Sequence, residues 1–127
     1  MKKCIRVFSY CLLALFLVSC FEEVDFGFPK TVELSNEGGE TILTGTTVIG
    51  HASIRGSGEQ ESKEYEQGED VSTGTNYFKL DWLKVEYNKN ETWLKLTADP
   101  NTSGTRRKRT IHMTTGPHYS EITVYQK

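Results

Sequence analysis

Cysteine is scarce in this chain of 127 residues, which contains only three. Cys4 and Cys11 lie in an apolar N-terminal segment, and Cys20 is the only cysteine that follows it. A single cysteine cannot form an internal disulfide, so the sequence excludes a disulfide-stabilised fold and leaves Cys20 to be explained.

Sequence signatures of catalysis are also missing. The chain has neither a Gly-x-Ser-x-Gly motif nor a His-Glu-x-x-His motif, and no cysteine after Cys20 could act as a nucleophile. The histidines His51, His112 and His118 are scattered. His112 and His118 flank a predicted hairpin and could meet, but a two-histidine metal site would lack further ligands nearby. The sequence therefore predicts a non-enzymatic protein without a metal or cofactor.

A long hydrophobic run is absent as well. The apolar stretch from Val7 to Val18 is about a dozen residues, whereas a membrane span needs roughly 20. With its basic start and a small residue before Cys20, residues 1–19 are typical of a secretory signal peptide. Leu17-Val18-Ser19-Cys20 resembles the bacterial lipoprotein box, which implies cleavage before Cys20 and its acylation with fatty acids such as palmitate. The alternative is an ordinary secreted protein in which Cys20 is incidental.

Excess positive charge is lacking once the leader is removed. The leader carries three of the 15 basic residues and none of the 17 acidic ones, so 12 basic and 17 acidic residues remain, a balance of −5. An acidic domain of this kind is not expected to bind nucleic acid through bulk charge, nor to adhere to an anionic membrane surface. We expect membrane attachment through the lipid on Cys20, because two acyl chains suffice for stable anchoring.

Helical periodicity is absent after residue 20, and alternating strand patterns take its place. In four runs every second residue is apolar, as in strands with one buried face: 81–87, 92–98, 110–114 and 121–126. Further strands are predicted at 28–34, 41–49 and 52–55, with a hairpin-type turn at Gly38-Gly39 and a bulge or bend at Gly45. The pattern predicts an all-β fold, an immunoglobulin-like antiparallel β-sandwich of about seven to eight strands over residues 28–127.

Two polar segments complete the organisation. Residues 20–27 are predicted to be a tether; their acidic residues resemble the export signal that surface lipoproteins of Bacteroidota carry, and a solvated linker is the alternative. Residues 56–76 are acidic and glycine-rich, which predicts a long loop with at most a poor edge strand near Tyr65. The dense carboxylates of this loop are compatible with calcium, but their spacing fits no known calcium loop, so a solvated charged segment is the favoured interpretation.

The chain from Phe28 to Gln126 resembles the BACON domain, an immunoglobulin-like β-sandwich common in Bacteroidota. The resemblance is carried by the order and spacing of several markers: Gly38-Gly39, Asp81-Trp82-Leu83, Asn101, Arg107 and the closing Ile122–Gln126. The family name implies carbohydrate binding, although fold alone does not fix function. The segment from Gly50 to Tyr77 is longer than expected for this family.

Alternation also selects candidate ligand residues, because sugar binding needs an exposed aromatic plane with polar groups beside it. Trp93, Lys95, His112 and Tyr125 are predicted to point outward, whereas Trp82 is predicted to lie in the core. Trp93 could instead cap the edge of the sandwich. The basic run Arg106–Arg109 could meet acidic glycans or lipopolysaccharide phosphates, or could contain one structural arginine, Arg107, beside solvated neighbours.

These observations favour a lipoprotein of the outer membrane, exposed at the cell surface, that binds carbohydrate or mucin glycans without catalysis. The alternative is a structural or protein-interaction subunit of a surface complex, which a sandwich with polar outer faces fits equally well.

Overall fold

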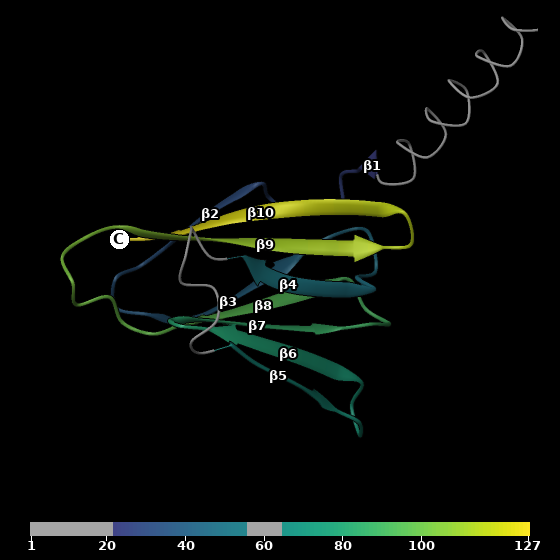
Figure 1. The fold of residues 1–127 in the computed structure, drawn as a ribbon, viewed down its shortest axis with the longest axis horizontal. Helices are drawn as coiled ribbons and strands as arrows, with labels where there is room; N and C mark the ends of the chain where they lie inside the picture. Colours follow the sequence, from purple (N-terminus) through teal and green to yellow (C-terminus); the bar gives the residue numbers. More distant parts are fainter. Residues whose placement is uncertain (1–21, 56–64) are drawn as a thin grey trace, which may run out of the picture.

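The computed structural model describes residues 22–55 and 65–127, which form a β-sandwich (Figure 1). Neither described range contains a helix, so neither contains one able to cross a membrane. The described residues contain ten strands: β1 (Glu22–Glu23), β2 (Thr31–Leu34), β3 (Gly39–Thr44), β4 (His51–Arg55), β5 (Tyr65–Asp70), β6 (Thr75–Leu80), β7 (Leu83–Asn88), β8 (Trp93–Ala98), β9 (Arg107–Thr115) and β10 (His118–Gln126).

The strands form two five-stranded sheets. In the first, called sheet A here, β10 pairs antiparallel with β9 and β9 with β4, while β1 and β2 pair parallel with the other side of β10. The second, sheet B, is antiparallel throughout in the order β3-β8-β7-β6-β5. The predicted fold class is confirmed, with ten strands instead of seven or eight because the structure adds the two-residue β1 and a hairpin, β5–β6.

The core lies between the sheets and follows the predicted alternation. Residues predicted to point inward from β8, β9 and β10 are all at most 4% exposed: Leu94, Leu96, Ala98, Ile111, Met113, Ile122 and Val124. Trp82 is 5% exposed, as expected for a core residue. Such close-packed apolar faces supply most of the stability of a sandwich.

The glycine pair at Gly38-Gly39 does not form the predicted hairpin. The preceding strand β2 pairs in sheet A and the following strand β3 pairs in sheet B, so these glycines carry the chain from one sheet to the other. Gly38 has φ +80°, and a Cβ there would lie 2.5 Å from the carbonyl oxygen of Ala98. The glycine is thus required by its positive φ and by a close approach between backbones, at a crossing between sheets instead of a hairpin.

Three other predicted segments differ from the structure. The strand expected over 41–49 ends at Thr44, followed by the predicted bend at Gly45, where a Cβ would lie 2.6 Å from the ring of Phe28. The loop expected over 56–76 includes strand β5 and the start of β6, while 56–64 lie outside the described residues. The tether expected over 20–27 is part of the sandwich from Glu22 onward, and Phe26 within it is 1% exposed.

The markers of the BACON resemblance converge at one end of the sandwich. Gln126 is fully buried, and its side-chain amide donates to the carbonyl oxygens of Ser35 (3.0 Å) and Asp99 (2.8 Å). Asn101 is 7% exposed and donates to the carbonyl oxygens of Thr105 and Lys127. These side chains satisfy backbone groups that the strands leave unpaired where the chain crosses between sheets, so the markers have a structural role.

Candidate functional site

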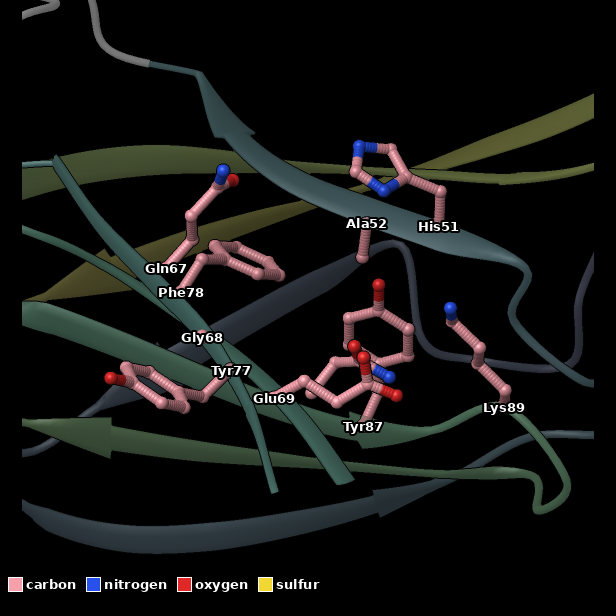
Figure 2. Close-up of a pocket in the computed structure, with 10 residues that line it drawn as sticks. His51, Ala52, Gln67, Gly68, Glu69, Tyr77, Phe78, Tyr87 and Lys89 are labelled. Atoms are coloured by element: carbon pink, nitrogen blue, oxygen red, sulfur yellow. The ribbon is translucent and has the colours of Figure 1, made fainter. Parts of the chain in front are cut away.

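A groove of about 330 Å³ opens where β4, the edge of sheet A, faces β5 and β6 of sheet B (Figure 2). Ten residues line it: His51, Ala52, Gln67, Gly68, Glu69, Asn76, Tyr77, Phe78, Tyr87 and Lys89. A concave site with a few polar groups over an apolar base is the usual form of a ligand site. We therefore take this groove as the candidate site.

The groove exists because sheet B extends one strand beyond sheet A. Strand β5 is the last strand of sheet B, and among the described residues no strand of sheet A covers it. By its pairing with β6, the inward positions of β5 include Gln67 and Glu69, which lie opposite Phe78 and Asn76. Both are polar and exposed, because this part of the inner face is in contact with water.

The base of the groove is aromatic and its rim is polar. Tyr87 (3% exposed) and Phe78 (2%) meet edge to face, with ring centroids 6.3 Å apart. In Figure 2 the hydroxyl of Tyr87 points toward Ala52 on β4, and Gln67 extends toward the same strand. His51 and Tyr77 contribute little to the interior, because their rings point away from it.

Two opposite charges stand at the rim. Glu69 lies on β5 and Lys89 directly follows β7, and both are exposed. Among the described residues neither has an opposite charge within ion-pair distance. A carboxylate, an ammonium group and the amides of Gln67 and Asn76 can together donate and accept hydrogen bonds, which suits a ligand rich in hydroxyl groups.

The predicted ligand residues Trp93 and Lys95 lie on the outer face of sheet B, away from the groove. Trp93 is half-buried, and its indole N–H donates to the carboxylate of Glu91. Lys95 lies 3.3 Å from Glu40 and 3.6 Å from Glu86. The hydrogen bond to Glu40 and the charges of Glu86 and Glu40 raise the pKa of Lys95 above its usual value, so this ammonium group is already engaged within the protein.

The other predicted ligand residues, His112 and Tyr125, lie on the outer face of sheet A. The guanidinium of Arg106 lies 3.9 Å from the ring centroid of Tyr125, so one face of the ring is covered. His112 stacks on Tyr119 with centroids 5.5 Å apart, and its Nδ1 lies 3.5 Å from Glu121. The structure therefore places the four candidates in two pairs on opposite faces of the sandwich.

Within sheet A, His112 and Tyr125 are also separated from each other. His112 pairs with Glu121, four residues along β10 from Tyr125, which corresponds to about 13 Å. His112 and His118 point to opposite faces, because the register places His118 opposite Thr115 and His112 opposite Glu121. No metal-ligand cluster of three or more acidic, cysteine or histidine residues occurs among the described residues.

The basic run from Arg106 to Arg109 is divided between the two faces of β9. Arg106 points outward and pairs with Glu33 at 2.7 Å, and Lys108 is exposed beside it. Arg107 points inward, where its Nε–H donates to Gln126 and burial lowers the pKa of its guanidinium. Arg109 bonds Asp81 at 2.5 Å, and both inward arginines lie over the ring of Trp82. The run is therefore not one basic patch, and Arg107 is structural, the alternative recognised in the sequence.

The groove was missed in the sequence, and Cys20 lies outside the described residues. Of the lining residues, His51 was named only as one of three scattered histidines, and Gln67, Gly68, Glu69 and Asn76 fell within the segment 56–76 that was predicted to be a polar loop. The available signal was the polarity of β5 at every position after Tyr65. That polarity indicates a loop as readily as it indicates a strand with both faces wet.

Comparisons with known proteins bear on the fold. No protein-family model matches the chain, and no curated protein sequence is matched. The chain is similar to a solved structure described as "NMR structure of the protein from Bacteroides thetaiotaomicron", with a TM-score of 0.53 and 15% sequence identity over 82% of this chain and 85% of that chain. At this level of identity the likeness shows the shared β-sandwich fold.

Proposed function

We propose that this protein is a lipid-anchored, non-catalytic binding module of the outer membrane, and that the groove between β4 and β5 binds carbohydrate. The observation that carries the proposal is the combination of an aromatic base with two amides, a carboxylate and an ammonium group around one cavity, the two charges having no ion-pair partner in the described part of the chain. Sugars present hydroxyl groups that such side chains bind directly, and C–H faces that contact apolar surface.

The resemblance to the BACON domain supports the same reading, as does the lipoprotein box at Leu17-Val18-Ser19-Cys20. Anchoring through Cys20 would place the module at the cell envelope, where polysaccharides are available. Membership of this family remains part of the proposal, as does exposure at the cell surface.

Glycan binding is tested directly with the acyl-free domain on arrays of mucin and plant glycans, followed by titration calorimetry. We expect Glu69→Gln and Lys89→Ala to weaken binding at least tenfold while the unfolding midpoint stays unchanged. Glu66→Gln is the matched control, because Glu66 lies on the same strand, is exposed and points to the other face of sheet B. Absence of binding across a broad panel, or equal loss in the control, would contradict the proposal.

A protein partner is the second candidate, and one observation favours it. Ile42 lies on β3, the other edge of sheet B, and is 66% exposed on the same outer face as Trp93. An exposed edge strand with an apolar side chain can pair with a strand from another protein. Co-purification from native membranes distinguishes the two: a stable partner that is lost with Ile42→Lys, without sugar affinity, favours this alternative.

A further inference from the structure

The chain enters the sandwich at one end and is fixed there at once. The two residues of β1 pair with His118 and Tyr119, directly after the β9–β10 turn at Gly116-Pro117. The backbone N–H of Glu22 donates to Pro117 (3.1 Å), and that of Val24 donates to Tyr119 (2.9 Å). Backbone hydrogen bonds therefore hold the chain from Glu22 onward.

The residues that follow β1 are also fixed, because they pack against the core. Val24 packs against the core, and Phe26 and Phe28 are 1% and 7% exposed. In a mature chain that begins at Cys20, only Phe21 separates the acylated residue from the first fixed one. Two residues of chain reach at most about 7 Å between the Cα atoms of Cys20 and Glu22. This end of the sandwich must then lie next to the lipid headgroups.

The same end carries three more connections, which lie on the same side of the picture as the β9–β10 turn in Figure 1, with the β5–β6 turn farthest from it. Residues 45–50 are held there by the bonds of Gly45 to Thr92 and of Gly50 to Thr114. The β5–β6 turn joins this group because the side-chain amide of Asn88 donates to the carbonyl of Thr73 at 2.8 Å. We call the whole the anchor end; it comprises residues 22–24, 45–50, 71–74, 89–92 and 115–118.

Two exposed apolar side chains lie on different connections of the anchor end. Only three large hydrophobic side chains are exposed among the described residues: Ile42, Val48 and Val71. Val48 (38% exposed) and Val71 (86%) both belong to the anchor end, and Val71 lies at the tip of the β5–β6 turn. An apolar side chain on a turn tip is suited to enter the boundary between headgroups and acyl chains.

We propose that the anchor end rests on the lipid surface, with Val71 in contact with the membrane and the polar end around Gln126 directed away from it. This inference rests on the proposed acylation of Cys20. The anchor end bears more acidic than basic residues (Glu22, Glu23 and Glu91 against Lys89). Contact therefore depends on the short attachment and on apolar burial, with no help from attraction to anionic headgroups.

The test uses the acylated protein purified from membranes and reconstituted in phosphatidylcholine vesicles that contain a headgroup-quencher lipid. A fluorophore is attached to Val71→Cys or, as the matched control, to Thr102→Cys, an exposed site in the loop at the opposite end. We expect quenching at position 71 to exceed that at position 102 at least threefold. A flexible ten-residue insertion between Phe21 and Glu22 should reduce the difference.

Mass spectrometry of the same samples separates two kinds of failure. An unacylated Cys20 overturns the anchor and this inference with it. An acylated Cys20 with equally weak quenching at both positions overturns the orientation alone and leaves the proposed anchor intact. Strong quenching at position 102 likewise overturns it, because the opposite end would then face the lipid.

Discussion

The guanidinium Nε–H of Arg107 donates to the side-chain oxygen of Gln126 across 2.8 Å, and Gln126 is completely buried. The side-chain amide of Gln126 in turn donates to the backbone carbonyls of Ser35 and Asp99. One side chain on β10 therefore connects β9 to the segment at Asp99, where the chain crosses from sheet B to sheet A. The interaction closes the end of the sandwich that is farther from β1.

Replacing Gln126 should destabilise the domain strongly. Gln126→Leu keeps the volume similar but leaves the guanidinium of Arg107 and two carbonyls without this partner, so we expect a loss of about 3 kcal/mol of unfolding free energy. Urea denaturation of the acyl-free domain measures it. As a control, Arg106→Gln removes an exposed ion pair with Glu33 and the exposed contact of the guanidinium with the ring of Tyr125, and should cost only about 1 kcal/mol. Similar costs for both variants would contradict this view.

Gly38 and Gly39 form a matched pair for testing backbone strain against steric contact. Both have positive φ, +80° and +116°, but a Cβ at Gly39 would meet nothing within 4 Å, whereas one at Gly38 would meet the Ala98 carbonyl. We expect Gly39→Ala to cost about 1–2 kcal/mol from strain alone. Gly38→Ala should cost at least about 1 kcal/mol more, because backbone must move to admit the methyl group. Thermal unfolding of the two variants side by side gives the comparison; equal costs would refute the contact.

Asp70 should respond to acid below the usual aspartate range. The hydroxyl of Ser72 donates to its carboxylate at 2.6 Å and the backbone N–H of Ser72 at 3.0 Å, and both bonds lower the pKa of Asp70 below 3.8. A lowered pKa in the folded state means that the stabilisation is complete above pH 3.8 and is lost as pH falls through the folded-state value.

An NMR titration of the carboxyl carbon checks the Asp70 prediction. Ser72→Ala should raise the pKa of Asp70 toward 3.8, whereas Ser53→Ala, a serine on β4, should leave it unchanged. A titration of Asp70 at or above 3.8 in the unaltered protein would be inconsistent with the bonds described.

A substitution of Trp93 tests whether glycan binds in the groove or on the outer face of sheet B. We expect Trp93→Ala to leave glycan affinity within about twofold, because its side chain lies on the outer face and the groove is lined from the inner one. Calorimetry with a glycan identified on the array measures this beside Glu69→Gln. A large loss with Trp93→Ala and none with Glu69→Gln would move the site to the outer face.

Cys20→Ser should release the protein from membranes. Each buried methylene contributes about 0.8 kcal/mol of membrane affinity, so loss of the acyl chains removes the dominant attachment. Labelled palmitate incorporation and membrane fractionation measure the effect; the variant should be soluble or retain its leader. The folded domain should be unaffected, because its described part begins after Cys20. A variant that is still processed and still membrane-bound would disprove the anchor.

Much of the fold was predictable from alternation alone. The strands β8, β9 and β10 each bury one face, so apolar residues such as Leu94, Ile111 and Ile122 stand at every second position. The same rule misses β5, because a strand that overhangs the opposite sheet has no buried face to mark it. The candidate groove was missed for the same reason, since Gln67 and Glu69 lie on that overhang.

The pairing between strands that are distant in the chain was harder to predict from the sequence. Gly38-Gly39 has the composition of a hairpin turn, but whether the next strand pairs with the previous one or crosses to the other sheet depends on contacts far along the chain, here with Ala98. Alternation did place Trp93 and Tyr125 on outer faces. It could not show that the two faces belong to different sheets, nor that Arg106 covers the ring of Tyr125.

The parallel pairing of β1 and β2 with β10 has a mechanical consequence. The chain enters at Glu22 beside His118 and leaves at Lys127 after Gln126, so entry and exit lie at opposite ends of a nine-residue strand that is about 30 Å long. A pulling force between Glu22 and Lys127 therefore acts along β10. It shears the β1–β10 and β2–β10 hydrogen bonds together instead of opening them one at a time. Tension applied between the two ends of the described chain is therefore resisted by strand pairs loaded in shear.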